Sequence, residues 1–97
     1  MSQETTPNDR AILVVLGSDR SGIVARVTAE LADHGVNILD ISQTILQGIF
    51  TMTMLVDLKA MDEDFAELHD ALQELAEDLG VQVTLQREEL FKLMYRL

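Results

Sequence analysis

Two segments far apart in this chain end a helix and begin a strand in the same way, and this repeat limits the possible folds more than any other feature. Residues 32–38 read ADHGVNI and residues 77–83 read EDLGVQV. Glycine can adopt the positive φ that terminates a helix, and a β-branched valine favours the strand that follows. The repeat therefore predicts two strand–helix–strand halves of similar size within one chain.

The first half begins with an unbroken apolar run. Residues 11–16 read AILVVL and end at a glycine, which predicts a strand in the middle of a sheet, buried on both faces. A polar turn, GSDRSG, follows at residues 17–22. Ile23, Val27 and Leu31 then recur at four-residue steps, and this spacing predicts an amphipathic helix over 23–35.

The middle of the chain has the pattern of an antiparallel hairpin. Residues 36–46 are rich in β-branched side chains, with Leu39, Ile41 and Ile45 on one parity. A Gln-Gly turn separates them from residues 49–58, which alternate strictly between apolar and polar side chains. The apolar set that shares one face of this second strand is Phe50, Met52, Met54, Val56 and Leu58.

The second half starts with the clearest helical pattern in the chain. Apolar residues between 61 and 79 fall at alternating steps of three and four, and the acidic Asp62, Glu63 and Asp64 stand at the start, where a helix dipole favours negative charge. Gly80 ends the helix, and residues 81–87 alternate as a last strand. The apolar tail, 88–97, predicts a short helix that packs on the domain or on a partner.

The element order is thus β-α-β-β-α-β, the α+β ferredoxin-like plan, followed by an extra short C-terminal helix. We expect one domain over residues 11–97, preceded by a flexible N-terminal arm over residues 1–10. Right-handed crossovers place both helices on one face of a four-stranded antiparallel sheet. The other face would be bare in a monomer, which argues for a dimer or a stacked partner.

Composition excludes several classes of function. The 97 residues include 17 acidic and 7 basic side chains, a net charge of −10, and no cysteine. Nucleic acids and anionic membranes require basic patches, and disulfides and thiolate metal sites require cysteine. The sequence also lacks a long apolar span and a signal-peptide pattern, so we expect a cytoplasmic protein without nucleic-acid or membrane partners.

The turn between the first strand and the first helix is the leading candidate site. Asp19, Arg20, Ser21 and Gly22 lie where unpaired backbone N–H groups of a helix start can bind an anion. Arg20 could hold a carboxylate, and Asp19 could attract an ammonium group. The alternative is an ordinary capped helix start. The glycine spacing of a dinucleotide site and the lysine of a phosphate-binding loop are both missing.

The start of the second strand is the other candidate. The amide of Asn37 can donate and accept hydrogen bonds together, which suits an amino-acid ligand, although it could equally satisfy its own backbone. The polar run that follows, Asp40, Ser42, Gln43 and Thr44, is either solvated or part of a subunit interface.

Other polar residues have plainer interpretations. His34 is expected to have a structural role at a helix C-terminus, and His69 to be a solvated surface residue. The spacing of the two histidines does not match a metal site, so no metal or other cofactor is expected. No serine, carboxylate pair or histidine stands in a catalytic pattern, so we expect no enzyme activity.

Residues 13–45, LVVLGSDRSGIVARVTAELADHGVNILDISQTI, resemble the first half of an ACT domain. The shared features are a hydrophobic strand, Asp-Arg-x-Gly-Ile-Val, a helix and Gly-Val-Asn-Ile. The chain is similar to the ACT domains of formyltetrahydrofolate deformylase and of the glycine cleavage system repressor. The tail FKLMY, residues 91–95, looks closer still to stand-alone ACT proteins of bacteria and archaea.

The resemblance implies a regulatory homodimer that binds an amino acid at its interface and acts on a separate protein partner. Matched to the family motif, the ligand site would comprise Asp19, Arg20, Ser21, Gly22 and Asn37, with Ile38 as an apolar wall. Many ACT domains have proline where this chain has Ser21. The alternative function is a ligand-independent interaction module that uses the acidic second helix and the apolar tail.

Overall fold

The computed structural model describes residues 9–18 and 20–94, and the first eight residues of the expected N-terminal arm lie outside this range. The elements are β1 (Arg10–Gly17), α1 (Arg20–Asp33), β2 (Asn37–Leu46), β3 (Ile49–Asp57), α2 (Phe65–Leu79), β4 (Gln82–Arg87) and α3 (Glu88–Met94). This is the predicted β-α-β-β-α-β order with its extra C-terminal helix. β1 begins at Arg10, a residue that the prediction assigned to the arm.

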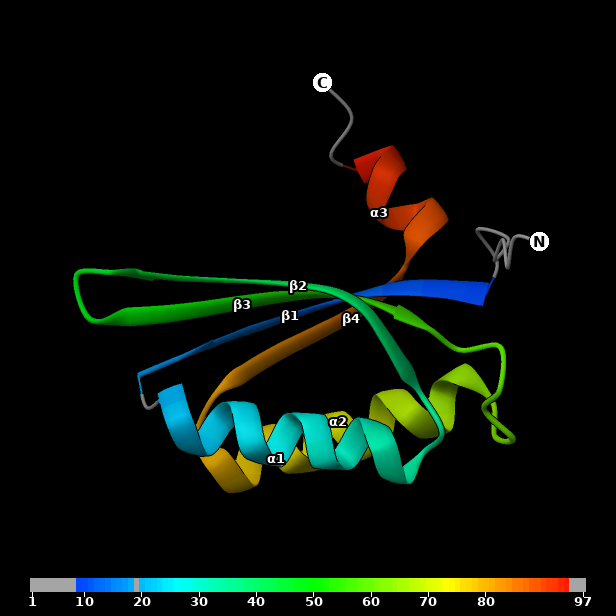
Figure 1. Cartoon of the computed structure of the whole chain (residues 1–97), viewed down its shortest axis with the longest axis horizontal. Coiled ribbons are helices and arrows are strands. Elements are labelled where there is room, and N and C mark those ends of the chain that lie inside the picture. Colours follow the sequence, from blue (N-terminus) through cyan, green and yellow to red (C-terminus); the bar gives the residue numbers. More distant parts are fainter. Residues whose placement is uncertain (1–8, 19, 95–97) are drawn as a thin grey trace.

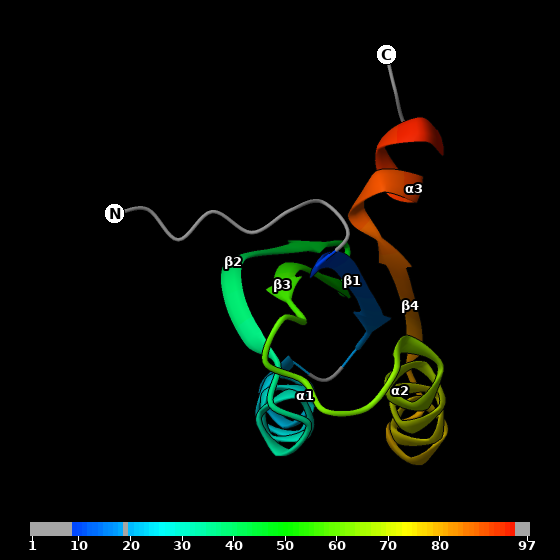
Figure 2. The same cartoon turned by 90° about the vertical axis from the view of Figure 1, so that its right-hand side faces the viewer.

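The four strands form one antiparallel sheet in the order β2-β3-β1-β4. Figure 1 shows α1 and α2 side by side against one face of this sheet, and Figure 2 shows α3 on the opposite side. The expected placement of both main helices on a single face is therefore confirmed. The two edges of the sheet are β2 and β4.

β1 is central, as predicted, but its two faces are not equally buried. Ala11, Leu13 and Val15 point toward the helices and are fully buried, whereas Ile12 and Val14 on the other face remain partly exposed. The prediction of burial on both faces was therefore wrong in degree. Hydrophobic side chains at every position reflect a central strand, but only one face has a helix layer over it.

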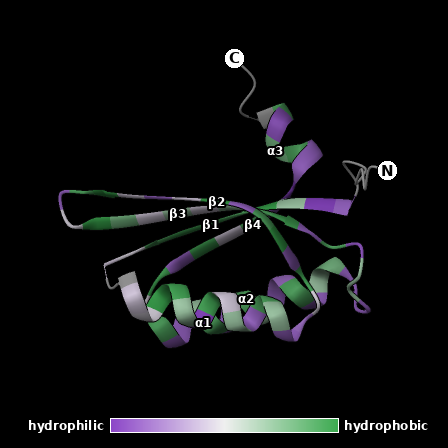
Figure 3. Ribbon diagram, viewed as in Figure 1, coloured by the Kyte–Doolittle hydropathy of each residue, from purple (hydrophilic) through white to green (hydrophobic). Residues whose placement is uncertain are grey.

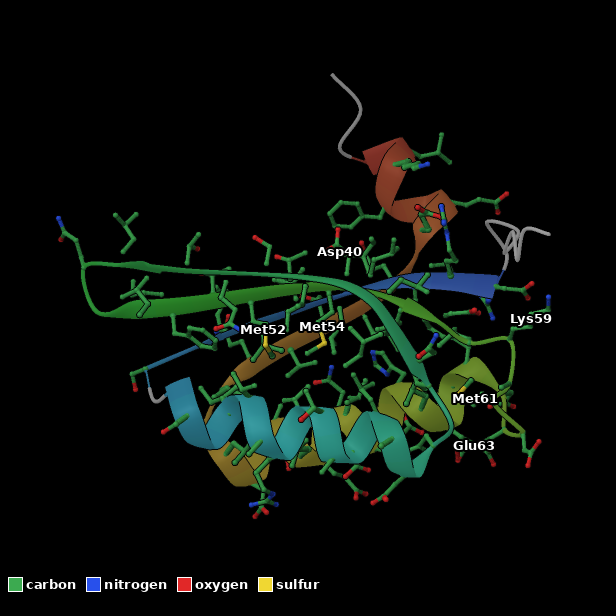
Figure 4. The ribbon with its side chains drawn as sticks, viewed as in Figure 1. Asp40, Met52, Met54, Lys59, Met61 and Glu63 are labelled. Carbon is green, nitrogen blue, oxygen red and sulfur yellow. The ribbon has the colours of Figure 1, made fainter. Side chains whose placement is uncertain are left out.

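The core lies between the sheet and the two helices. Met52 and Met54 of β3 point toward the helix layer in Figure 4, and both side chains are fully buried. Hydrophobic residues alternate with hydrophilic ones along α1 and α2 (Figure 3), which is the pattern of helices covered on one side only. The buried residues that the helices contribute are Ile23, Val27, Leu31, Leu68, Leu72, Leu75 and Ala76.

The hairpin between β2 and β3 turns through Gln47 and Gly48, whose φ angles are +52° and +82°. Two successive residues with positive φ match the tight turn that the right-handed twist of paired strands favours. A bulge interrupts the pairing between Ile38 and Asp40, so Leu39 is an extra residue in β2. The bulge places Asp40 on the face away from the helices, opposite Leu55.

α2 begins at Phe65, four residues later than the periodicity predicted. Asp64 is its N-cap: its carboxylate accepts a hydrogen bond from the Glu67 backbone N–H at 3.0 Å, and the Glu67 side chain accepts one from the Asp64 N–H. This reciprocal capping box fixes the helix start. Apolar Met61 continues the helical spacing without being helical, which explains the error.

Candidate functional site

The turn after β1 is shaped by close packing at Gly17. A Cβ at this position would lie 2.6 Å from Val81 Cγ1 and 2.7 Å from Ile23 Cδ1, so a side chain here would displace the core. The prediction placed Ser21 and Gly22 in the loop before the helix. In the structure α1 starts at Arg20, so both residues lie in its first turn. Asp19 and the side chain of Arg20 lie outside the described residues.

The first turn of α1 retains the property that made it a candidate. The first four N–H groups of any helix lack partners within the helix, and here they include those of Ser21 and Gly22. Ser21 is exposed and Gly22 is partly exposed, so solvent or a ligand can approach this end of the helix. A carboxylate bound here would gain about 0.3–1 kcal/mol from the helix dipole.

Asn37 and Ile38 lie at the other end of α1. The helix ends at Asp33, the chain turns through Gly35 with φ +75°, and β2 begins at Asn37. The part of α1 from Gly22 to Asp33 spans about 17 Å, so Gly22 and Asn37 cannot contact one ligand within a single chain. The two candidate groups, Ser21–Gly22 and Asn37–Ile38, therefore lie apart in one copy, and we refer to them as candidate half-sites.

Strand pairing shows which elements share an end of the molecule. Gly17 pairs with Phe50, and Phe50 pairs with Ile45, so the C-terminal end of β2 lies at the same end as the β1–α1 turn. β2 is an edge strand whose residues are exposed almost throughout, including Ile41 at 39% and Ile45 at 53%. The outer edge of β2 therefore runs from one half-site to the other.

A cluster of ionisable side chains lies at the turn between α1 and Asn37. His34 bonds through Nδ1 to a Glu63 carboxylate oxygen and through Nε2 to Glu30 Oε2 at 3.0 Å. The hydrogen bond to Glu63 is the main cause that raises the pKa of His34 above its usual value, and the bond to Glu30 adds to it. His34 thus ties the end of α1 to the segment before α2.

This cluster refines the expected structural role of His34. Glu30 precedes His34 by four residues, a spacing visible in the sequence. Glu63 comes from the other half of the chain, so only the fold brings it to the imidazole. Beside the cluster lies a hollow of about 430 Å³, lined by Ala32, Asp33, His34, Gly35, Ala60, Asp62 and Glu63.

His69, by contrast, is half exposed and lies 3.7 Å from an Asp70 oxygen, as expected for a surface residue. Within the described residues, no group of three histidine, aspartate or glutamate side chains is placed to hold a metal ion. In the same part of the chain, no helix is long and apolar enough to cross a membrane.

Comparisons with known proteins identify the fold. A family model for the ACT domain matches residues 9–86. The chain belongs to the ACT domain family. A UPF0237 protein of Methanocaldococcus jannaschii is 49% identical over 88 residues, which cover 91% of this chain and 98% of that protein. A UPF0237 protein of Bifidobacterium longum is 47% identical over 89 residues, which cover 92% and 99%.

Several solved structures share the fold of this chain. An ACT domain protein from Streptococcus pneumoniae is 40% identical with a TM-score of 0.76, over 89% of this chain and 97% of that one. A formyltetrahydrofolate deformylase from Pseudomonas syringae is 26% identical with a TM-score of 0.72, over 79% of this chain but only 26% of the enzyme. A structure described as that of a glycine cleavage system transcriptional repressor shares the fold at 15% identity with a TM-score of 0.71, over 89% of this chain and 51% of that one. The predicted resemblance is confirmed in each of its three parts.

Proposed function

We propose that this ACT protein is a regulatory homodimer that binds an amino acid between its two subunits and acts on a separate protein partner. One observation carries the proposal: the first turn of α1 and the start of β2 lie at opposite ends of one helix, with an exposed edge strand between them. A site that uses both half-sites needs a second copy.

The strand order supplies a way to join the half-sites. If two copies pair antiparallel along β2 about a two-fold axis, the Asn37 end of one strand lies beside the Leu46 end of the other. Within each copy, the Leu46 end of β2 lies at the same end of the sheet as the β1–α1 turn, because Gly17 pairs with Phe50 and Phe50 pairs with Ile45. Asn37 of one copy would therefore lie toward the β1–α1 turn of the other. Each of the two equivalent sites would then take residues from both copies, as two-fold symmetry requires.

The chemistry of these residues suits a zwitterion. Backbone N–H groups of Ser21 and Gly22 would bind the carboxylate at the positive end of the α1 dipole. Asn37, which is exposed, would donate and accept from the other subunit, while partly buried Ile38 would form an apolar wall. Asp19 and Arg20 remain proposed ligand residues on the basis of the family motif.

Regulation would follow from linkage. A ligand that touches both subunits binds the closed dimer more tightly than the free chains, so it shifts the equilibrium by that difference in affinity. Helix α1 of each copy would lie beside the paired β2 edges. A shift of α1 on ligand binding would therefore change the surface that a partner protein contacts. The ACT family assignment supports a regulatory rather than a catalytic role.

Isothermal calorimetry against the twenty amino acids tests the proposal. One or a few should bind, and Asn37→Ala or Gly22→Val should weaken binding about tenfold or more while the circular dichroism spectrum stays unchanged. Glu74→Ala, at an exposed position on α2 away from both candidate half-sites, is the control and should bind normally. No heat and no thermal stabilisation from any amino acid would contradict the proposal.

One observation favours the second candidate function, a ligand-independent interaction module. Leu90 and Leu93 of α3 are 49% and 68% exposed in an otherwise acidic protein. A module of this kind would show the same oligomeric state and melting temperature with and without every amino acid, and its binding partner would be lost when residues 88–97 are removed.

A further inference from the structure

The sheet face opposite α1 and α2 is almost free of charge. Register places on it Ile12, Val14 and Leu16 of β1 beside Thr53 and Leu55 of β3. The remaining central positions of this open face are Ser42, Thr44, Leu46, Ile49, Thr51, Gln82, Thr84 and Gln86. In a chain of net charge −10, this face thus stands out as a surface with few charged groups.

The charged groups of this side lie at its border. Arg10 is bound to Glu88 through two hydrogen bonds, Nε–Oε1 at 2.7 Å and Nη2–Oε2 at 2.8 Å, and Asp57 lies opposite Arg10 at the same end of the sheet. Asp40 points to the same side but stands at the bulge near the start of β2 (Figure 4). A second copy can therefore meet this face without the like-charge repulsion that most of its own surface would cause.

Helix α3 adds exposed apolar side chains beside the open face. Figures 1 and 2 show α3 rising from the end of β4 on the open side. The Arg10–Glu88 pair anchors its first turn, and Phe91 helps to line a hollow of about 250 Å³ with Ile12, Val14, Leu16, Thr84 and Gln86. Leu90 and Leu93, three residues apart, are exposed on this helix although its base is fixed.

The size of this surface fits a protein interface. Four strands of six to ten residues, at about 3.3 Å per residue and about 4.8 Å apart, give a face of about 500 Å². The flank of α3 raises the surface to roughly 600–800 Å² per copy, in the range of specific interfaces. The face combines six apolar side chains, Ile12, Val14, Leu16, Leu46, Ile49 and Leu55, with uncharged polar ones, a composition that a second protein surface can cover.

We propose that the open faces of two copies pack against each other, sheet on sheet, with α3 of each copy closing over the flank of the other. Two sheets stacked this way lie about 10 Å apart, which leaves α3 standing beside the second sheet. Leu90 and Leu93 then contact the other copy. This interface is separate from the β2 edge, so both together would produce a tetramer with three perpendicular two-fold axes.

Analytical ultracentrifugation of the full chain tests the proposal. Thr84→Glu puts a charge on the open face at an exposed position, and Leu93→Ser removes an exposed side chain that the fold of one copy does not need. Each should halve the assembly mass, or raise its dissociation constant tenfold or more. Ala66→Glu, the same charge change on the exposed side of α2, is the matched control and should leave the mass unchanged.

A third variant separates this interface from the dimer of the proposed function. Ile41→Glu places two like charges near the axis of a β2–β2 pair and leaves the open face intact. If only Ile41→Glu lowers the mass, the edge dimer stands and the stacked faces are wrong. If only Thr84→Glu and Leu93→Ser lower the mass, the stacked faces stand and the edge dimer is wrong. A wild-type chain that stays monomeric at 100 μM, the concentration we would use, overturns the face-to-face proposal.

Discussion

The two faces of the sheet consist of the same four strands but differ in what covers them. Toward α1 and α2, Leu13 and Met54 are fully buried, whereas Ile12 and Val14 on the other face keep contact with solvent. Burial on the first face drives folding of the single chain. Apolar residues that a single chain leaves exposed on the second face are better explained by association. Adjacent residues of one strand can thus contribute to two different equilibria, the folding of one chain and the association of two chains.

The largest expected effect compares neighbours on β1. Leu13→Ala should lower the free energy of unfolding by about 2–5 kcal/mol, because it leaves a cavity in a closely packed core. Val14→Ala, on the open face, should cost about 1 kcal/mol or less in a dilute monomeric sample. Urea denaturation of both variants at low protein concentration measures the difference. Equal losses would show that the two faces do not differ as we describe.

The capping box tests how much the helix layer depends on local structure. Asp64→Ala removes the acceptor for the Glu67 N–H and should cost about 1 kcal/mol. Asp64→Ser retains an acceptor and should recover most of the loss. Thermal unfolding followed by circular dichroism compares the two variants. If alanine and serine behave alike, the N-cap does not limit stability of the layer.

The His34 cluster predicts a pH dependence. Its folded-state pKa is raised, so the stabilisation is complete below the unfolded value of about 6.5 and is lost as pH rises through the higher folded value. His34→Gln should therefore cost about 1 kcal/mol at pH 6 and less at pH 9. His69→Gln, half exposed, is the control, and its effect should be small at both values. A loss that grows with pH would contradict the assignment.

The smallest effect concerns the outer surface of the helix layer. Arg26 and Asp78 form a salt bridge at 3.3 Å between α1 and α2, but their side chains are 53% and 70% exposed. Arg26→Met should change the free energy of unfolding by less than about 0.5 kcal/mol, because solvent screens exposed ion pairs. Denaturation in low and high salt checks this. A loss above 1 kcal/mol would mean that surface charge holds the two helices together.

Sequence alone determined the element order, the central place of β1 and the apolar set of β3, because each depends on local periodicity and on glycines that end helices. It also indicated the family through residues 13–45. Its errors came where two signals competed. The spacing of Met61 and Phe65 continues a helix that the Asp64 cap starts later, and the apolar Ile12 and Val14 suggested burial that no helix layer supplies.

Only the tertiary structure decided how the candidate residues relate in space. Gly22 and Asn37 belong to one motif in the sequence, yet about 17 Å of α1 separates Gly22 from the helix end before Asn37, so a shared ligand requires two copies. The Glu63–His34 and Arg10–Glu88 pairs join residues 29 and 78 positions apart, and no local pattern specifies them. Local periodicity fixes which elements form, whereas long-range packing fixes which side chains meet.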